Sequence, residues 1–189
     1  PPPSPSPPTP PPSPPPLSPS LLLRALPKET FDFSVGIAAS LGWSTGGGES
    51  HAFTKKEGRT PSGGTGPSAG VGGSGSYVFA ETSWPKVKGD LFTLAYDGSA
   101  CSDTGVGISN VTFYYHMYGK AMGELRVTNA AGEAVWSQSG DKGNSWQAAE
   151  EVNVTSPSFA FEYTRGNGWK GDAAVAQVTV SCGKQVLPR

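Results

Sequence analysis

The sequence contains few of the residues on which metal or nucleophilic chemistry depends. Its 189 residues include two cysteines and two histidines, and His51 and His116 lie far apart in the chain. Zinc sites and catalytic pairs bring such residues together at short, recognisable spacings. The sequence has no Gly-x-Ser-x-Gly elbow, no His-Glu-x-x-His and no phosphate-binding glycine loop. We therefore expect no enzyme activity and no resident cofactor.

An excess of charge and a long hydrophobic run are also missing. Fourteen Lys and Arg residues balance fifteen Asp and Glu residues, and the formal net charge is −1. No stretch gathers the basic residues that nucleic-acid phosphates would need, so nucleic acid is not an expected partner. The longest apolar run, residues 21–26, is far shorter than the ~18–20 residues of a spanning helix and contains Arg24. No membrane insertion is expected within this chain.

Proline, in contrast, is abundant at the amino end, where 13 of the 19 prolines fall in the first 19 residues. Proline fixes φ and disfavours helix in the residue before it, so this block predicts an extended polyproline II rod. We assign residues 1–27 to a proline-rich stalk, 28–183 to one folded domain and 184–189 to a C-terminal tail. The Ser-Pro block resembles the hydroxyproline-rich glycoproteins of plant and green-algal walls, which implies prolyl hydroxylation and a wall location.

After the stalk, short runs of β-type composition alternate with glycine and polar turns. Residues 108–118 and 159–163 carry apolar side chains at every second position, as in antiparallel strands with one face on a core. Ser44–Ser76 reads as a long Gly/Ser/Thr loop region with a short strand near residues 51–54. Apart from this short strand, the predicted strands cover residues 31–33, 77–83, 91–96, 108–118, 123–129, 133–137, 146–154, 159–163 and 173–182. This pattern predicts an all-β sandwich of two antiparallel sheets.

Cysteine usage and glycosylation motifs indicate the secretory route. Cys101 and Cys182 are accompanied by two Asn-x-Thr sequons, at Asn110 and Asn153. An even number of cysteines beside such sequons favours a disulfide over two reduced core thiols. The expected location is therefore extracellular, at a cell wall or cell surface.

An ordered series of motifs runs through residues 31–182. Phe31-Asp32-Phe33 and Gly42-Trp43 come first, and the most specific motif is Phe113–Gly119 (FYYHMYG), continued by Met122–Val127 (MGELRV). The others are Thr65-Gly66-Pro67, Tyr77–Ser83, Trp136, Gly140, Gly143, Trp146, Phe159–Glu162 and Gly171–Val175. In this order and spacing the motifs resemble the MAM domain, the extracellular module of meprin, A-5/neuropilin and receptor tyrosine phosphatase mu.

The resemblance implies a jelly-roll β-sandwich and matches Cys101 and Cys182 to the family's second disulfide. The family's first disulfide has no counterpart, because no cysteine precedes Cys101. We expect packing of Phe31, Phe33 and Trp43 to hold the amino end instead.

Calcium-binding members of the family supply carboxylates near the first strand, after the Gly-Pro motif and in an Asp-Asp pair near the end. Here Ser34, Gly70 and the pair Ala176-Gln177 stand at those places. Asp32 and Asp172 remain as candidate metal ligands. Calcium takes six to eight oxygens, several of them charged, so these two residues make an incomplete site.

Three functions remain open. The first is an adhesion or protein-interaction module that binds an extracellular protein or a second copy of itself, with Ser44–Ser76 as the contact surface. The second is a carbohydrate-binding module for wall glycans, with Trp84 and Trp169 as stacking platforms because both lie in turn-like settings. The third is a non-catalytic accessory domain of a larger secreted enzyme such as a protease.

Overall fold

The computed structural model describes residues 27–38, 40–46, 51–102 and 106–183. The predicted stalk, apart from Pro27, and the tail at 184–189 lie outside the described residues. Within the described ranges, no helix has the length and apolar character that crossing a membrane requires.

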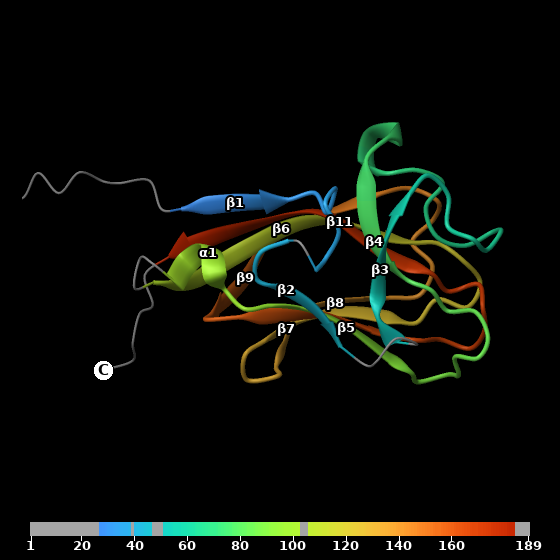
Figure 1. The fold of residues 1–189 in the computed structure, drawn as a ribbon. Helices are drawn as coiled ribbons and strands as arrows, with labels where there is room; N and C mark the ends of the chain where they lie inside the picture. Colours follow the sequence, from blue (N-terminus) through green and yellow to red (C-terminus); the bar gives the residue numbers. More distant parts are fainter. Residues whose placement is uncertain (1–26, 39, 47–50, 103–105, 184–189) are drawn as a thin grey trace, which may run out of the picture.

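Two antiparallel sheets face one another across a single core (Figure 1). The first has the order β3-β4-β11-β6-β9, and β1 also pairs with β11. Its strands are β1 (Lys28–Phe31), β3 (Phe53–Glu57), β4 (Ser76–Ala80), β6 (Gly107–Met117), β9 (Gln147–Ser156) and β11 (Ala173–Gly183). The second has the order β2-β5-β10-β7-β8, with β2 (Trp43–Gly46), β5 (Leu91–Tyr96), β7 (Glu124–Asn129), β8 (Ala134–Ser139) and β10 (Phe159–Thr164). The prediction of an all-β jelly-roll sandwich is confirmed.

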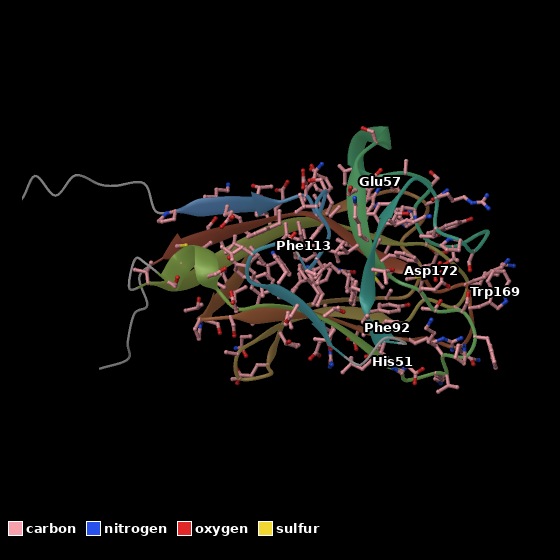
Figure 2. All side chains as sticks on the ribbon, viewed as in Figure 1. His51, Glu57, Phe92, Phe113, Trp169 and Asp172 are labelled. Atoms are coloured by element: carbon pink, nitrogen blue, oxygen red, sulfur yellow. A yellow bond between two sulfur atoms is a disulfide. The ribbon has the colours of Figure 1, made fainter. Side chains whose placement is uncertain are left out.

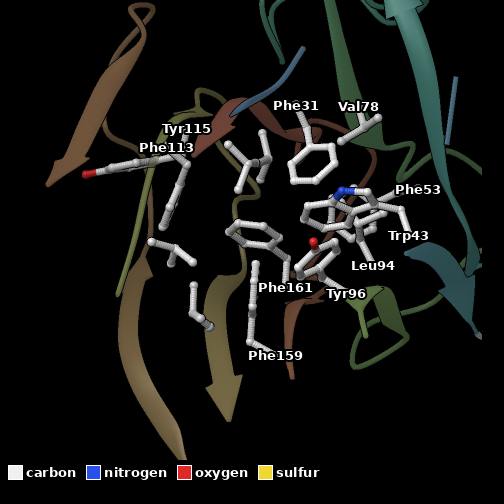
Figure 3. Close-up of a cluster of buried hydrophobic side chains, with 14 of the residues drawn as sticks. Phe31, Trp43, Phe53, Val78, Leu94, Tyr96, Phe113, Tyr115, Phe159 and Phe161 are labelled. Atoms are coloured by element: carbon white, nitrogen blue, oxygen red, sulfur yellow. The ribbon is translucent and has the colours of Figure 1, made fainter. Parts of the chain in front are cut away.

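Aromatic side chains from both sheets fill the core (Figure 3). Phe113 of β6 and Phe161 of β10 meet edge to face, with ring centroids 4.8 Å apart. Trp43 lies 5.4 Å from Phe31 and 5.2 Å from Phe33, also edge to face. Such pairs stabilise a core by about 0.5–1.5 kcal/mol beyond their buried area. The amino end is therefore held by aromatic packing, as expected for a chain without the family's first disulfide.

The outer face of the first sheet carries a second apolar cluster, formed by Tyr77, Phe79, Ala174 and Ala176 with Val71 and Trp146 against it. His116 of β6 is buried beside this cluster, with its ring centroid 5.4 Å from that of Trp146. Burial lowers the pKa of His116 to about 4. The loop over this face is fixed by a hydrogen bond from Nε1 of Trp146 to the carbonyl of Ala69, at 2.9 Å.

The predicted strands differ from the observed ones at three main places, and one of these is the predicted strand 77–83, which ends three residues beyond β4. The predicted first strand, residues 31–33, is wrong in its bounds: β1 is Lys28–Phe31, and the chain turns at Phe33, whose φ is 59°. A left-handed residue interrupts the regular strand backbone, and the pairing of β1 with β11 ends before Phe33, at Phe31. The predicted loop Ser44–Ser76 contains most of β2, whose four residues pair with β5, and β3 begins two residues later than expected.

The described chain enters and leaves the sandwich at one end. A disulfide joins Cys101 of the short helix α1 (Ser99–Ser102) to Cys182 of β11. The amide of Cys182 donates a hydrogen bond to the carbonyl of Pro27, at 2.9 Å, and Lys28 pairs with Ser181. Pro27 and Gly183 therefore lie near α1, at the end opposite the long connections that follow β3, β4 and β10 (Figure 1).

Candidate interaction surface

Four of the connections at the end of the sandwich away from α1 are joined by buried polar contacts (Figures 1 and 2). They are residues 58–75 between β3 and β4, 81–90 between β4 and β5, 118–123 between β6 and β7, and 165–172 between β10 and β11. We call this region the loop end. Connections that a rigid sandwich holds in place are where binding residues concentrate in β-sandwich proteins.

Buried polar side chains lock the four connections together. The amide and hydroxyl of Thr82 both donate to Oδ1 of Asp172, each at 3.0 Å. The backbone amide of Asp172 donates to Oγ1 of Thr65 at 2.8 Å, and that hydroxyl donates to the carbonyl of Tyr118 at 2.9 Å. One residue from each connection is thus tied into a single hydrogen-bond network.

Arg165 adds a second set of ties. Its Nε donates to the carbonyl of Thr82 at 2.8 Å, and its amide donates to the carbonyl of Asp90 at 2.9 Å. The amide of Gly89 returns a hydrogen bond to the carbonyl of Arg165 at 3.0 Å. Because Thr82, Arg165 and Asp172 are all buried, these bonds are shielded from competing water. The loop end is a preorganised surface.

Burial of Asp172 has an electrostatic cost. Desolvation, opposed by the Thr82 hydrogen bonds and reinforced by the nearby Glu81 carboxylate, raises the pKa of Asp172 to about 6. The second carboxylate oxygen, Oδ2, has no hydrogen-bond partner although it is fully buried. The carboxyl group of Asp172 therefore titrates at a pH near 6.

The two tryptophans predicted as binding platforms both face solvent at the loop end. Trp84 is 89% exposed and Trp169 is 49% exposed. Trp169 lies at this end of the molecule (Figure 2), and Nζ of Lys170 is 4.8 Å from the centroid of its ring. The carbonyl of Trp169 is also 3.0 Å from Oγ1 of Thr82, so the two tryptophan-bearing connections are in direct contact. Large exposed aromatics on a rigid base are typical of recognition surfaces.

The exposed charge of the loop end is positive, a feature that the balanced overall composition concealed. The four connections carry the cations Arg59, Lys86, Lys88, Lys120, Arg165 and Lys170, and all of these except Arg165 reach the surface. Their acidic residues are Glu81, Asp90 and Asp172, and none of the three is fully exposed. Asp90 is also paired with His51, at 3.0 Å. Counting charges turn by turn, rather than over the chain, would have found this signal.

Asp32 and Asp172 do not form a common metal site. Asp32 is exposed after β1, and its Oδ1 accepts a hydrogen bond from the amide of Ser34 at 2.8 Å, the main cause of its lowered pKa. Asp172 is enclosed within the loop end. Across the described parts of the chain, no three His, Cys, Asp or Glu side chains gather where they could hold a metal ion. The donor set does not fit calcium.

The two predicted glycosylation sites lie together on the first sheet. Asn110 of β6 is paired with Asn153 of β9, and both side chains point away from the core. Of the predicted contact region Ser44–Ser76, residues 58–75 join the loop end, whereas residues 47–50 are outside the described part.

The chain is a disulfide-bonded β-sandwich whose loop end is rigid and carries two exposed tryptophans. It belongs to the MAM family, since the model of the MAM domain, meprin/A5/mu, matches residues 34–184. MAM domain-containing glycosylphosphatidylinositol anchor protein 1 of Rattus norvegicus is 37% identical over 144 residues, which cover 71% of this chain. The Gallus gallus protein of the same name is 39% identical over 143 residues, or 70% of the chain. The matched segment spans 14% of the length of each of these two relatives.

Solved structures support the fold. The K3 adhesin domain of Lys-gingipain from Porphyromonas gingivalis superposes with a TM-score of 0.57 at 14% sequence identity, over 81% of this chain and 98% of that domain. The K1 adhesin domain of the same protein gives a TM-score of 0.56 at 15% identity, over 82% of this chain and 98% of that domain. At these identities the likeness concerns the architecture.

Proposed function

We propose that this chain is an extracellular, non-catalytic adhesion module that binds another extracellular protein through the loop end. Its family is represented among curated proteins by glycosylphosphatidylinositol anchor proteins, which supports a place at the cell surface. The observation that carries the proposal is the exposure of Trp84 and Trp169 on connections locked by the buried Thr82–Asp172 network. Preorganised aromatic anchors of this kind contribute most of the binding energy in protein interfaces.

Charge indicates the kind of partner. The four connections carry five exposed or half-exposed cations, whereas of their three acidic residues Asp172 is buried and Glu81 and Asp90 are half-exposed. A partner with an acidic surface would be attracted to this end, and complementary charge raises association rates more than it raises affinity. A second copy of the chain fits less well, because two loop ends would repel one another.

The test is a binding screen with matched variants. The chain is tested against a panel of recombinant extracellular domains, and beads coated with the chain are scored for self-aggregation. We expect Trp84→Ala and Trp169→Ala each to weaken partner binding by about tenfold or more. Leu41→Ala is the control, because Leu41 is 73% exposed and lies near α1. Unchanged binding by both tryptophan variants, or equal loss in the control, would exclude the loop end as the contact.

A second candidate function is carbohydrate binding at the same tryptophans. Exposed indole rings can stack on sugar rings, and Lys86, Lys88 and Lys170 would favour an acidic polysaccharide such as a uronate. A glycan array separates the two functions: a retained polysaccharide that Trp84→Ala or Trp169→Ala releases would favour this one, and a blank array would remove it.

The remaining proposals concern what lies around the module. Residues 1–27, as a hydroxyproline-rich stalk rising ~3.1 Å per residue, would hold the module away from a wall or membrane. An accessory role in a larger secreted enzyme is compatible with the same loop end. Sequencing the full-length transcript and mass spectrometry of the stalk for hydroxyproline test these two points.

A further inference from the structure

A polar groove of about 380 Å³ lies on the outer face of the first sheet, away from the loop end. Thr112 and Tyr114 of β6 form its floor. Glu150 and Glu151 of β9 line one side, and Gln177 and Thr179 of β11 line the other. The volume falls within the roughly 300–1,000 Å³ of typical ligand sites.

Two β-bulges on either side of β6 create this groove. On β11, Ala176 pairs with Tyr114 but Thr179 pairs with Thr112, so β11 carries one extra residue. On β9, Val152 pairs with Val111 but Ala149 pairs with Phe113, so β9 carries one extra residue at the same level. Bulges interrupt the pleat and re-aim side chains, and they are enriched beside functional sites. Here the bulge on β9 points the neighbouring Glu150 and Glu151 both to solvent.

Both bulges hold a non-glycine residue in the left-handed region. Gln177 has φ 48° and Glu151 has φ 54°, and both line the groove. This conformation costs roughly 1–2 kcal/mol for a residue with a Cβ. Such strain concentrates at ligand sites, where side-chain placement outweighs it. The core packing does not require either side chain, because both are exposed.

The chemistry of the groove suits a sugar. Carboxylates accept hydrogen bonds from neighbouring hydroxyl groups, and a side-chain amide and threonine hydroxyls can both accept and donate. Tyr114 supplies an aromatic surface on the floor. No basic residue lines the groove, so a neutral saccharide fits it better than a phosphate or sulfate ester.

Asn110 places a sugar source at the end of this groove. Asn110, Thr112 and Tyr114 follow one another at every second position on the outer face of β6, so Asn110 stands about 7 Å from the groove floor. A glycan attached there would be present at an effective concentration that no free polysaccharide reaches. Its attachment forms a bond from the Asn110 amide nitrogen to the anomeric carbon of the oligosaccharide and breaks the bond from that carbon to lipid diphosphate, which leaves together with the displaced amide proton.

We propose that the groove seats the inner sugars of an N-linked glycan carried on Asn110. The inference rests on the proposed function only in requiring secretion, and it does not involve the loop end. The seated glycan would cover the outer face of β6, β9 and β11 and restrict protein contacts to other surfaces. Asn153 lies beside Asn110 on the edge strand β9, and a glycan on Asn153 would extend past the edge of the first sheet.

The experiment uses the full chain secreted from a eukaryotic host, with Thr155→Ala included to leave only the Asn110 sequon. Glycopeptide mass spectrometry measures occupancy, and a peptide-N-glycosidase removes the glycan from the native protein. We expect native release at least about tenfold slower than release from the denatured chain. Gln177→Gly and Glu151→Gly should accelerate native release several-fold. Glycine suits the left-handed backbone, so neither variant should lose its fold.

Ser137→Ala, on the exposed face of β8 in the other sheet, is the control and should leave the release rate unchanged. An unoccupied Asn110 would overturn the proposal. So would release from both glycine variants at the wild-type rate. The aglycosylated Asn110→Gln chain is also titrated with N,N′-diacetylchitobiose. Binding of this disaccharide that Gln177→Gly abolishes would support a sugar-binding groove. If the attached glycan is unprotected and an added polysaccharide binds instead, the groove belongs to an external ligand and the proposal is wrong. Partner binding at the loop end is scored separately, so failure of either proposal is distinguishable.

Discussion

Thr82 and Asp172, 90 residues apart in the chain, are joined twice: the amide and the hydroxyl of Thr82 both donate to the same carboxylate oxygen, at 3.0 Å. The bond pair closes the connection that bears Trp84 onto the one that bears Trp169. The geometry of the proposed binding surface therefore depends on one buried contact below it.

Thr82→Val tests this dependence, because it keeps the shape of the side chain and removes the hydroxyl. The loss of a hydrogen bond to a buried carboxylate should lower the free energy of unfolding by about 1.5–3 kcal/mol. Urea denaturation measures it, and hydrogen exchange should rise at residues 82–90 and 165–172. Thr54→Val on the exposed face of β3 is the control and should stay within about 0.5 kcal/mol of wild type. Equal effects of the two substitutions would show that the contact carries no special weight.

The contribution of Asp172 to the free energy of unfolding should decrease as pH rises. Its pKa is 3.8 in an unfolded chain and about 6 in the fold, so between these values the folded state binds more protons. The contribution is complete below pH 3.8 and is lost as pH rises through about 6. The difference between the pKa values corresponds to about 3 kcal/mol. In urea melts at several pH values, Asp172→Asn should lack this decline; parallel curves for variant and wild type would contradict it.

His116 should act in the opposite direction. Its pKa falls from 6.5 to about 4 on folding, so the unfolded state binds more protons between these values. The contribution is complete above pH 6.5 and is lost as pH falls toward 4. His116→Gln should therefore flatten the acid side of the stability curve, whatever its effect at neutral pH. The NMR titration of the His116 ring checks the cause directly, and a midpoint near 6.5 would refute it.

The disulfide should contribute substantially to stability because it closes a long loop. Cys101 and Cys182 are separated by 81 residues, for which chain-entropy estimates give about 4 kcal/mol. In the double variant Cys101→Ser, Cys182→Ser, the free energy of unfolding should be lower by about 4 kcal/mol. The melting temperature should fall accordingly, and calorimetry measures the change. Wild type under reducing conditions should match it. A double variant as stable as oxidised wild type would show that core packing alone fixes these strands.

The bulge residues offer a test of backbone strain. Gln177→Gly removes a Cβ from a left-handed position and so relieves backbone strain in the folded state. This stabilisation is partly offset because glycine gives the unfolded chain more conformational entropy. We expect a net stabilisation of up to about 1 kcal/mol. Ser137→Gly, in an ordinary strand position, should destabilise by about 0.5–1 kcal/mol. Loss of stability in both variants would mean that the Gln177 side chain supports the sheet.

Local pattern was enough to predict most strands and the inward-facing side chains. Phe159, Phe161 and Tyr163 alternate with polar residues, and all three are buried. The same reasoning missed β2, because its four residues, Trp-Ser-Thr-Gly, carry one apolar side chain and owe their strand to pairing with β5.

Features that depend on distant partners could not be read from the sequence. His116 lies on the face of β6 that alternation assigns to solvent, yet it is buried because Trp146 and the loop at Ala69 cover that face. The bulges at Gln177 and Glu151 have no glycine to mark them. The turn-like settings of Trp84 and Trp169 left both exposure and packing under loops open, and the structure shows exposure. The Thr82–Asp172 network below them joins residues that no local motif connects.

The shared exit of Pro27 and Gly183 determines how the module would respond to mechanical tension. A force applied at these two points separates β1 from β11, starting at the end where both strands leave the sandwich. The backbone pairings of β1 therefore open one after another, from Lys28 to Phe31. β11 cannot be drawn out beyond Cys182, because the disulfide secures it to α1. The four-residue β1 would therefore yield first, and the distal tryptophan surface would keep its shape under tension.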